Sequence, residues 1–162
     1  MAADTAGSSW THTGLAQQLH FAPRAVERAG EVVRGLRARR VLLMTTEGRL
    51  ASPAGEALQA ALGRVLVTTF AGVRSHVPAA MVEEAVARAR DEQVDLVVSF
   101  GGGSCADAAK AVCFFMERRA GTPGSSYLDR PVLGHVAIPT TYSGAELTPF
   151  FGMTDEAARR KQ

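Results

Sequence analysis

The feature that most constrains this chain is the regular alternation of short, continuous apolar runs with helical segments. A strand that is apolar at every position is buried on both faces, so helices must cover both faces of its sheet. The runs occupy residues 41–45, 65–68, 96–100 and 136–138. The pattern predicts an α/β fold, a doubly wound parallel sheet flanked by helices.

The segments between these runs have the spacing of amphipathic helices. Residues 25–36 carry one apolar helical face, and residues 18–21 before them are compatible with a short strand. Ser52 is placed as the N-cap of the next helix, with Pro53 at its first position. Pro78 starts the helix after that.

Composition bounds the function. The 162 residues suffice for about one domain. The charge of +2 is spread over 18 basic and 16 acidic residues, which argues against a nucleic-acid partner. No apolar run approaches the ~20 residues of a membrane span, and the first residues have no secretory pattern. We therefore expect a cytoplasmic protein whose polar residues 1–16 are typical of a disordered leader.

A glycine-rich junction joins the apolar run 96–100 to an alanine-rich helix. Gly101, Gly102 and Gly103 are followed by Ser104. Glycines permit positive φ and leave no Cβ between backbone and ligand, while the helix start directs unpaired N–H groups at the gap. Ligands of doubly wound sheets bind beyond the carboxyl ends of the strands. The junction predicts a diphosphate site.

Two well-known phosphate-binding glycine motifs fit this junction poorly. A Walker A loop is excluded because no Gly-Lys-Ser/Thr follows at the required interval. Gly101, Gly103 and Ala106 formally satisfy G-x-G-x-x-A. However, they follow the third apolar run, and no acidic residue ends a strand about twenty positions later. The ordinary Rossmann fingerprint is therefore weakly supported.

Asp107 also has structural interpretations. Ser104 and Asp107 match the S-x-x-D capping pattern at a helix start. Lys110 could pair with Asp107 on the helix surface at i, i+3 spacing. These alternatives stay open beside a role in ligand binding.

Cysteine and histidine show no ligand pattern. Cys105 and Cys113 lie ~12 Å apart along the expected helix, too far for a disulfide, and are expected to be buried small hydrophobes. The four histidines are scattered, and we expect no metal site in this chain. They are His12, His20, His76 and His135, of which His135 is expected at a strand edge.

A second motif follows the last apolar run. Pro139, Thr140 and Thr141 end that run and lead into a turn of small residues, Ser143 and Gly144. Parallel strands deliver their carboxyl ends to one edge of the sheet. The threonine hydroxyls are therefore placed to face whatever the glycines hold.

Together the motifs resemble the iron-containing alcohol dehydrogenase superfamily. Residues 101–110 match its GGGSxxDxAK segment, and residues 139–149 nearly reproduce the PTTYAGSEMTP stretch of the maleylacetate reductases, the nearest branch. The likeness covers about residues 10 to 161. It implies a dehydroquinate synthase-like N-terminal domain that binds NAD(P)H.

The resemblance also implies the cofactor-binding residues. Gly101 to Gly103 and Ser104 would cradle the pyrophosphate, and Thr140, Thr141 and Phe150 would line the adenosine and ribose side. Lys161 matches a lysine near the ribose and phosphates, although a frayed basic tail is an alternative. The full set is Gly101, Gly102, Gly103, Ser104, Asp107, Thr140, Thr141, Phe150, Lys161 and Thr46.

Thr46 stands where relatives choose between NADH and NADPH through an acidic residue. Glu47 lies about one position from that place, so the preference for NAD or NADP stays open.

Members of this superfamily continue into a helical domain. The resemblance places there the substrate pocket and, in metal-dependent members, an aspartate and three histidines that bind iron or zinc. The sequence ends at Gln162, so we expect the helical second domain to be absent and the chain alone to be nearly inactive.

Three functions remain. The first is the NAD(P)H-binding domain of a maleylacetate reductase-like oxidoreductase, which in its complete form converts maleylacetate to 3-oxoadipate. The second is the same domain of a metal-dependent alcohol dehydrogenase. The third is a stand-alone nucleotide-binding module without catalysis. The expected partner is the small-molecule cofactor, a homodimer is an open assembly state, and neither a nucleic acid nor a membrane is expected as a partner.

Overall fold

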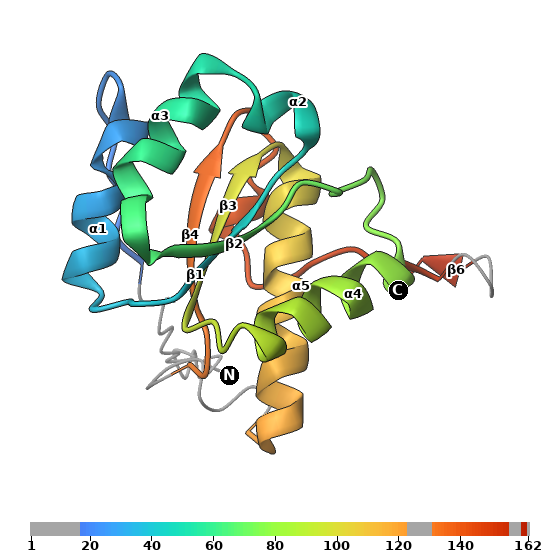
Figure 1. Cartoon of the computed structure of the whole chain (residues 1–162). Helices are drawn as coiled ribbons and strands as arrows, with labels where there is room; N and C mark the ends of the chain where they lie inside the picture. Colours follow the sequence, from blue (N-terminus) through green and yellow to red (C-terminus); the bar gives the residue numbers. More distant parts are fainter. Residues whose placement is uncertain (1–16, 123–130, 156–159, 162) are drawn as a thin grey trace, which may run out of the picture.

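Four parallel strands form one sheet in the order β2-β1-β3-β4 (Figure 1). The computed structural model describes residues 17–122, 131–155 and 160–161, so the expected leader lies outside the described residues. The strands are β1 Val41–Met44, β2 Leu66–Phe70, β3 Leu96–Gly101 and β4 Gly134–Pro139. The predicted parallel α/β fold is confirmed.

Helices cover both faces of the sheet. Helices α1 and α3 pack on one face, and α4 and α5 pack on the other (Figure 1). The α-helices are α1 Ala29–Gly35, α2 Glu47–Leu50, α3 Pro53–Leu62, α4 Ala79–Asp91 and α5 Gly103–Ala120. Short 3₁₀ turns are η1 Ala25–Arg28, η2 Gly63–Val65 and η3 Ala145–Leu147.

Strand β1 shows why its run is continuously apolar. Val41 and Leu43 point to the face covered by α1 and α3, while Leu42 and Met44 point to the face covered by α4 and α5. All four side chains are fully buried. Each large apolar side chain removed from water contributes about 1.5–3 kcal/mol, so a polar residue on either face would be costly.

The outer strands differ from the inner ones. Strand β2 is only half-buried except at Phe70, and β4 is likewise only partly buried. The prediction that all four runs are buried on both faces is therefore wrong for these two, because each has a neighbour on one side only. His135 lies on outer strand β4, as expected.

The predicted starts of α3 and α4 are confirmed. The strand predicted over residues 18–21 and the single helix predicted over residues 25–36 are wrong. The Ser52 hydroxyl accepts a hydrogen bond from the Gly55 amide at 3.1 Å, and α4 begins directly after Pro78. Residues 18–21 form no strand. The helix expected over 25–36 splits into η1 and α1 and ends at Gly35, which leaves Leu36 exposed.

Two elements were not predicted. Strands β5 Thr154–Asp155 and β6 Arg160–Lys161 pair antiparallel to each other, outside the main sheet. The Thr154 amide donates to the Val77 carbonyl at 3.0 Å, which attaches β5 beside the start of α4. Two-residue strands are too short to leave a periodic signal in the sequence.

None of the helices in the described ranges combines the length and apolar character that crossing a bilayer requires.

Candidate functional site

The site lies where the winding of the sheet reverses. The chain leaves β1 toward β2 on one side, and it leaves β3 toward β4 on the other. Neighbouring strands whose connections diverge leave a crevice outside their carboxyl ends, the usual ligand position in doubly wound folds. Thr46 follows β1 and Gly101 ends β3, so the structure brings both predicted residues to this edge of the sheet.

Each glycine of the turn is adjacent to a different neighbour. Gly101 has a φ of +152°, and a Cβ there would lie 2.4 Å from the Cys105 sulfur. A Cβ on Gly102 would approach the Thr141 methyl group at 3.3 Å, and one on Gly103 would lie 2.9 Å from the Ser143 hydroxyl. The turn therefore brings bare backbone against the second motif.

The start of α5 is open to an anion. The helix begins at Gly103 with Gly102 in the N-cap position, and a glycine brings no side chain to satisfy the first amides. Ser104 is the second residue of the helix, so the capping pattern of Ser104 and Asp107 is wrong as an explanation of this start. A glycine N-cap leaves donors for a ligand.

The second motif lies directly beside the turn. Gly101 pairs with Pro139 across β3 and β4, and the Thr140 amide donates to the Gly101 carbonyl at 2.8 Å. The Thr140 hydroxyl is buried and has no hydrogen-bond partner among the residues described. The structure thus brings Thr140 and Thr141 together with the glycines.

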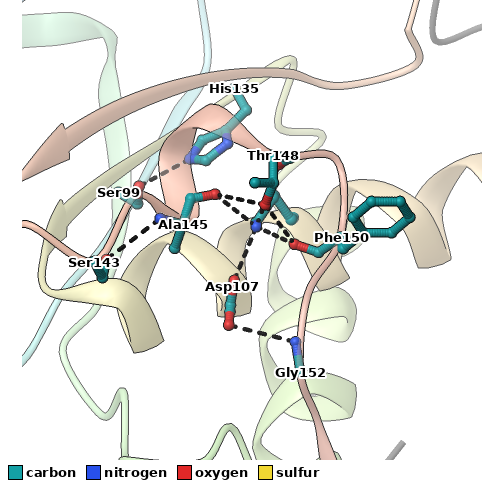
Figure 2. A network of polar contacts seen from close by, with 9 residues as sticks. Ser99, Asp107, His135, Ser143, Ala145, Thr148, Phe150 and Gly152 are labelled. Atoms are coloured by element: carbon teal, nitrogen blue, oxygen red, sulfur yellow. Dashed lines mark hydrogen bonds and ion pairs between the residues drawn. The ribbon is translucent and has the colours of Figure 1, made fainter.

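Lys110 has a role that the sequence analysis missed. Its ammonium nitrogen donates to the carbonyls of Ala145 at 2.8 Å, Thr148 at 3.4 Å and Phe150, and it pairs with Asp107 at 2.9 Å (Figure 2). The i, i+3 pair was foreseen, but the surface location was wrong, since the Lys110 side chain is only 11% exposed. Its place in the GGGSxxDxAK motif was the available signal.

The remaining predicted residues are more dispersed. Thr46 is the N-cap of α2, and its hydroxyl accepts from the Arg49 amide at 3.3 Å. Phe150 is 79% exposed and is joined to α5 through its carbonyl. Lys161 lies on β6 and pairs with Thr154, in a ladder separate from the main sheet. Thr46 therefore lies at the same edge of the sheet as the glycine turn, while Phe150 and Lys161 lie on segments further along the chain.

The Cys105 thiol beside the turn is held uncharged. Burial raises the pKa of the Cys105 thiol to about 11, against weaker opposing effects of the Gly102 backbone and Arg49. Cys105 is therefore a protonated, buried packing residue, as expected. The same expectation is wrong for Cys113, which is only partly buried.

The His135 side chain lies on the face of the sheet that α5 covers, at the register level of Val97. Burial lowers its pKa to about 4, and the charge of Lys110 adds to the shift. Its Nε2 lies 2.8 Å from the Ser99 hydroxyl. The ring is therefore neutral near pH 7.

A separate hollow of about 330 Å³ lies beside the carboxyl end of β2. Its lining includes Phe70, Gly72, Arg74 and Arg88. None of the turn glycines lines this hollow, so the hollow lies apart from the glycine turn.

Comparison with known proteins identifies the family. The iron-containing alcohol dehydrogenase family matches residues 16–162. This chain belongs to that family. The resemblance drawn from the two motifs is confirmed.

The relatives that this family member matches include maleylacetate reductases. Maleylacetate reductase 2 of Cupriavidus pinatubonensis is 34% identical over 140 residues, which are 86% of this chain and 34% of that protein. The maleylacetate reductase of Sphingobium indicum is 32% identical over 145 residues, 90% of this chain and 36% of that protein. The chain therefore spans about a third of the length of these curated relatives.

A solved structure agrees with the fold. The crystal structure of maleylacetate reductase from Agrobacterium tumefaciens has 27% sequence identity and a TM-score of 0.77, covering 96% of this chain and 39% of that one.

The family name refers to iron. Within residues 17–122, 131–155 and 160–161 the structure contains no group of three histidine, cysteine, aspartate or glutamate side chains placed to hold a metal ion.

Proposed function

We propose that this chain binds the diphosphate of NAD(P)H at residues 101–104, as the nucleotide-binding domain of a maleylacetate reductase-like oxidoreductase. The complete enzyme would reduce maleylacetate to 3-oxoadipate. The observation that carries the proposal is the open start of α5, beside which the buried Thr140 hydroxyl has no partner within the described residues.

The turn fits a diphosphate chemically. A helix start contributes about 0.3–1 kcal/mol per anionic charge through its dipole, so further donors are required. The first amides of α5 and the Thr140 hydroxyl are such donors. The bare backbone at Gly102 lets phosphate oxygens approach closely.

The other predicted residues take secondary places in this proposal. Thr141, Phe150 and Lys161 would line the adenosine and ribose side, and Thr46 would lie near the ribose. Asp107 would act through Lys110 and the Gly152 amide, which it contacts at 3.3 Å. When bound, the reduced dinucleotide supplies the hydride, while these residues hold and orient it.

A second candidate keeps the domain but changes the parent enzyme. The residues after the glycines, Cys105, Ala106 and Asp107, resemble the general alcohol dehydrogenase form more than the Thr-Thr-Gly of many maleylacetate reductases. A parent of this kind would hold iron or zinc outside the described residues and act on simple alcohols and aldehydes.

The test is a Gly102→Asp variant titrated with NADH and with NADPH. Aspartate is a favoured N-cap residue and Gly102 has the extended backbone of a cap, so α5 should form normally. The new carboxylate would repel a diphosphate by about 1–4 kcal/mol. We expect both dissociation constants to rise at least about tenfold. Unchanged affinity for both dinucleotides would contradict the proposal.

The matched control is Gly35→Asp. Gly35 is exposed at the end of α1, with open space where a Cβ would be placed. It introduces the same charge at the opposite end of the sheet. Its affinity for both dinucleotides should equal that of the unaltered chain.

A further inference from the structure

The segment between β4 and β5 has little regular structure of its own. Residues 140–153, here called the strap, contain one short 3₁₀ turn, η3. The strap carries Thr141 and Ser143 against the glycine turn. Its position therefore depends on contacts other than a strand ladder.

One side chain, that of Lys110, donates hydrogen bonds to several carbonyls of the strap. The Lys110 ammonium donates to Ala145 at 2.8 Å, to Thr148 at 3.4 Å and to Phe150. These three residues lie within positions 145–150 of the strap, and their carbonyls turn toward the same point beside α5 (Figure 2). A lysine has three N–H donors and no acceptor, which suits a cluster of carbonyl oxygens.

Asp107 completes the attachment from the same helix. One carboxylate oxygen pairs with Lys110 at 2.9 Å, and the other accepts from the Gly152 amide at 3.3 Å. The Lys110 and Asp107 side chains are only 11% and 26% exposed. Largely buried charges are costly unless they are paired and hydrogen-bonded, and the strap that covers this pair also supplies the carbonyls and the amide that satisfy it.

The attachment is linked to the glycine turn through α5. Gly103 begins the helix, and Lys110 lies two turns further along it. The strap thus contacts one helix at two levels, with Ser143 against Gly103 and the later carbonyls on Lys110.

We propose that Lys110, with Asp107, is a positioning residue for the dinucleotide: it fastens the strap to α5 and so holds the threonines of the strap beside the diphosphate turn. This inference rests on the proposed function for its ligand. If the strap is in place for only a fraction of the time, the apparent dissociation constant equals the intrinsic one divided by that fraction.

The experiment combines hydrogen exchange and titration. Lys110→Met keeps the aliphatic stem and removes the charge, and Asp107→Asn/Lys110→Met removes both charges so that no unpaired carboxylate remains. Amide exchange is measured without ligand, and NADH and NADPH are then titrated into each variant. We expect faster exchange within residues 145–152 and dissociation constants raised about tenfold in both variants.

Arg40→Met is the matched control. Arg40 also ties a backbone carbonyl and a carboxylate, those of Glu92, but at the amino end of the sheet. It should change neither strap exchange nor affinity, even if it lowers the thermal midpoint.

The outcomes separate the two proposals. Unchanged strap exchange in the double variant would overturn the fastening by Lys110. Faster exchange with unchanged affinity would make Lys110 a structural residue only, and would also overturn the inference. An unaltered chain that binds neither dinucleotide would overturn the proposed function and the ligand part of the inference, while the exchange result would still decide the fastening.

Discussion

The two sides of the proposed site are built in opposite ways. The glycine turn is fixed by the absence of side chains, with a backbone conformation at Gly101 that L-residues rarely adopt. The strap is fixed by the presence of two charged side chains, Lys110 and Asp107. The turn joins β3 directly to α5, whereas the strap packs against α5 through η3 and the later carbonyls. Damage to the turn should therefore lower global stability, and damage to the strap should open it locally.

The largest expected effect is on the turn. Gly101→Ala requires an unfavourable φ and places a Cβ 2.4 Å from the Cys105 sulfur. We expect the free energy of unfolding to fall by about 3 kcal/mol, measured by urea denaturation. Gly121→Ala is the control, because Gly121 has φ +76° but open space around it. It should cost only about 1 kcal/mol. Equal losses would show that the contact with Cys105 is unimportant.

The next effect is the contribution of His135 to the pH dependence of the free energy of unfolding. The pKa of His135 is lowered to about 4, so its contribution is complete above pH 6.5 and is lost as the pH falls from 6.5 to 4. In a His135→Gln variant, the free energy of unfolding should fall by about 3 kcal/mol less over that pH interval than in the unaltered chain. Chemical denaturation of both proteins at pH 7 and pH 4 measures this. The same acid loss in both would contradict the neutral state of the ring.

A smaller effect is expected in the strap. Asp107→Ala removes the partner of Lys110 and the acceptor of the Gly152 amide. We expect a loss of about 1–2 kcal/mol in the free energy of unfolding, with faster exchange in residues 145–152. Amide exchange in β3 should become faster only by the amount that the lower free energy of global unfolding accounts for. Loosening of β3 beyond that would erase the distinction between the two regions.

The smallest effect tests whether stability alone changes binding. Ser52→Ala removes the N-cap of α3, on the opposite face of the sheet, and should cost about 1 kcal/mol. Calorimetric titration with NADH should give the affinity of the unaltered chain. A weakened affinity would mean that general destabilisation accounts for the effects attributed to the strap.

The sequence predicted the parts of the molecule whose causes are local. Continuous apolar runs predicted the strands, and Ser52 with Pro53 predicted the start of α3, because burial and capping act within a few residues. The half-buried state of β2 and β4 could not be predicted, since it depends on which strands end up at the sheet edges.

The candidate site divides in the same way. The glycine turn could be found from its composition alone. The convergence of three carbonyls on Lys110 could not, because it joins residues 35 to 40 positions apart through a segment without periodicity.

The central claim is that a dinucleotide diphosphate lies on the turn between β3 and α5. A crystal structure of the chain grown with NADH or NADPH tests it most directly. We predict phosphate oxygens within hydrogen-bonding distance of the amides of Gly103 and Ser104 and of the Thr140 hydroxyl. A dinucleotide bound elsewhere, with Thr141 and Ser143 closed over an empty turn, would contradict it.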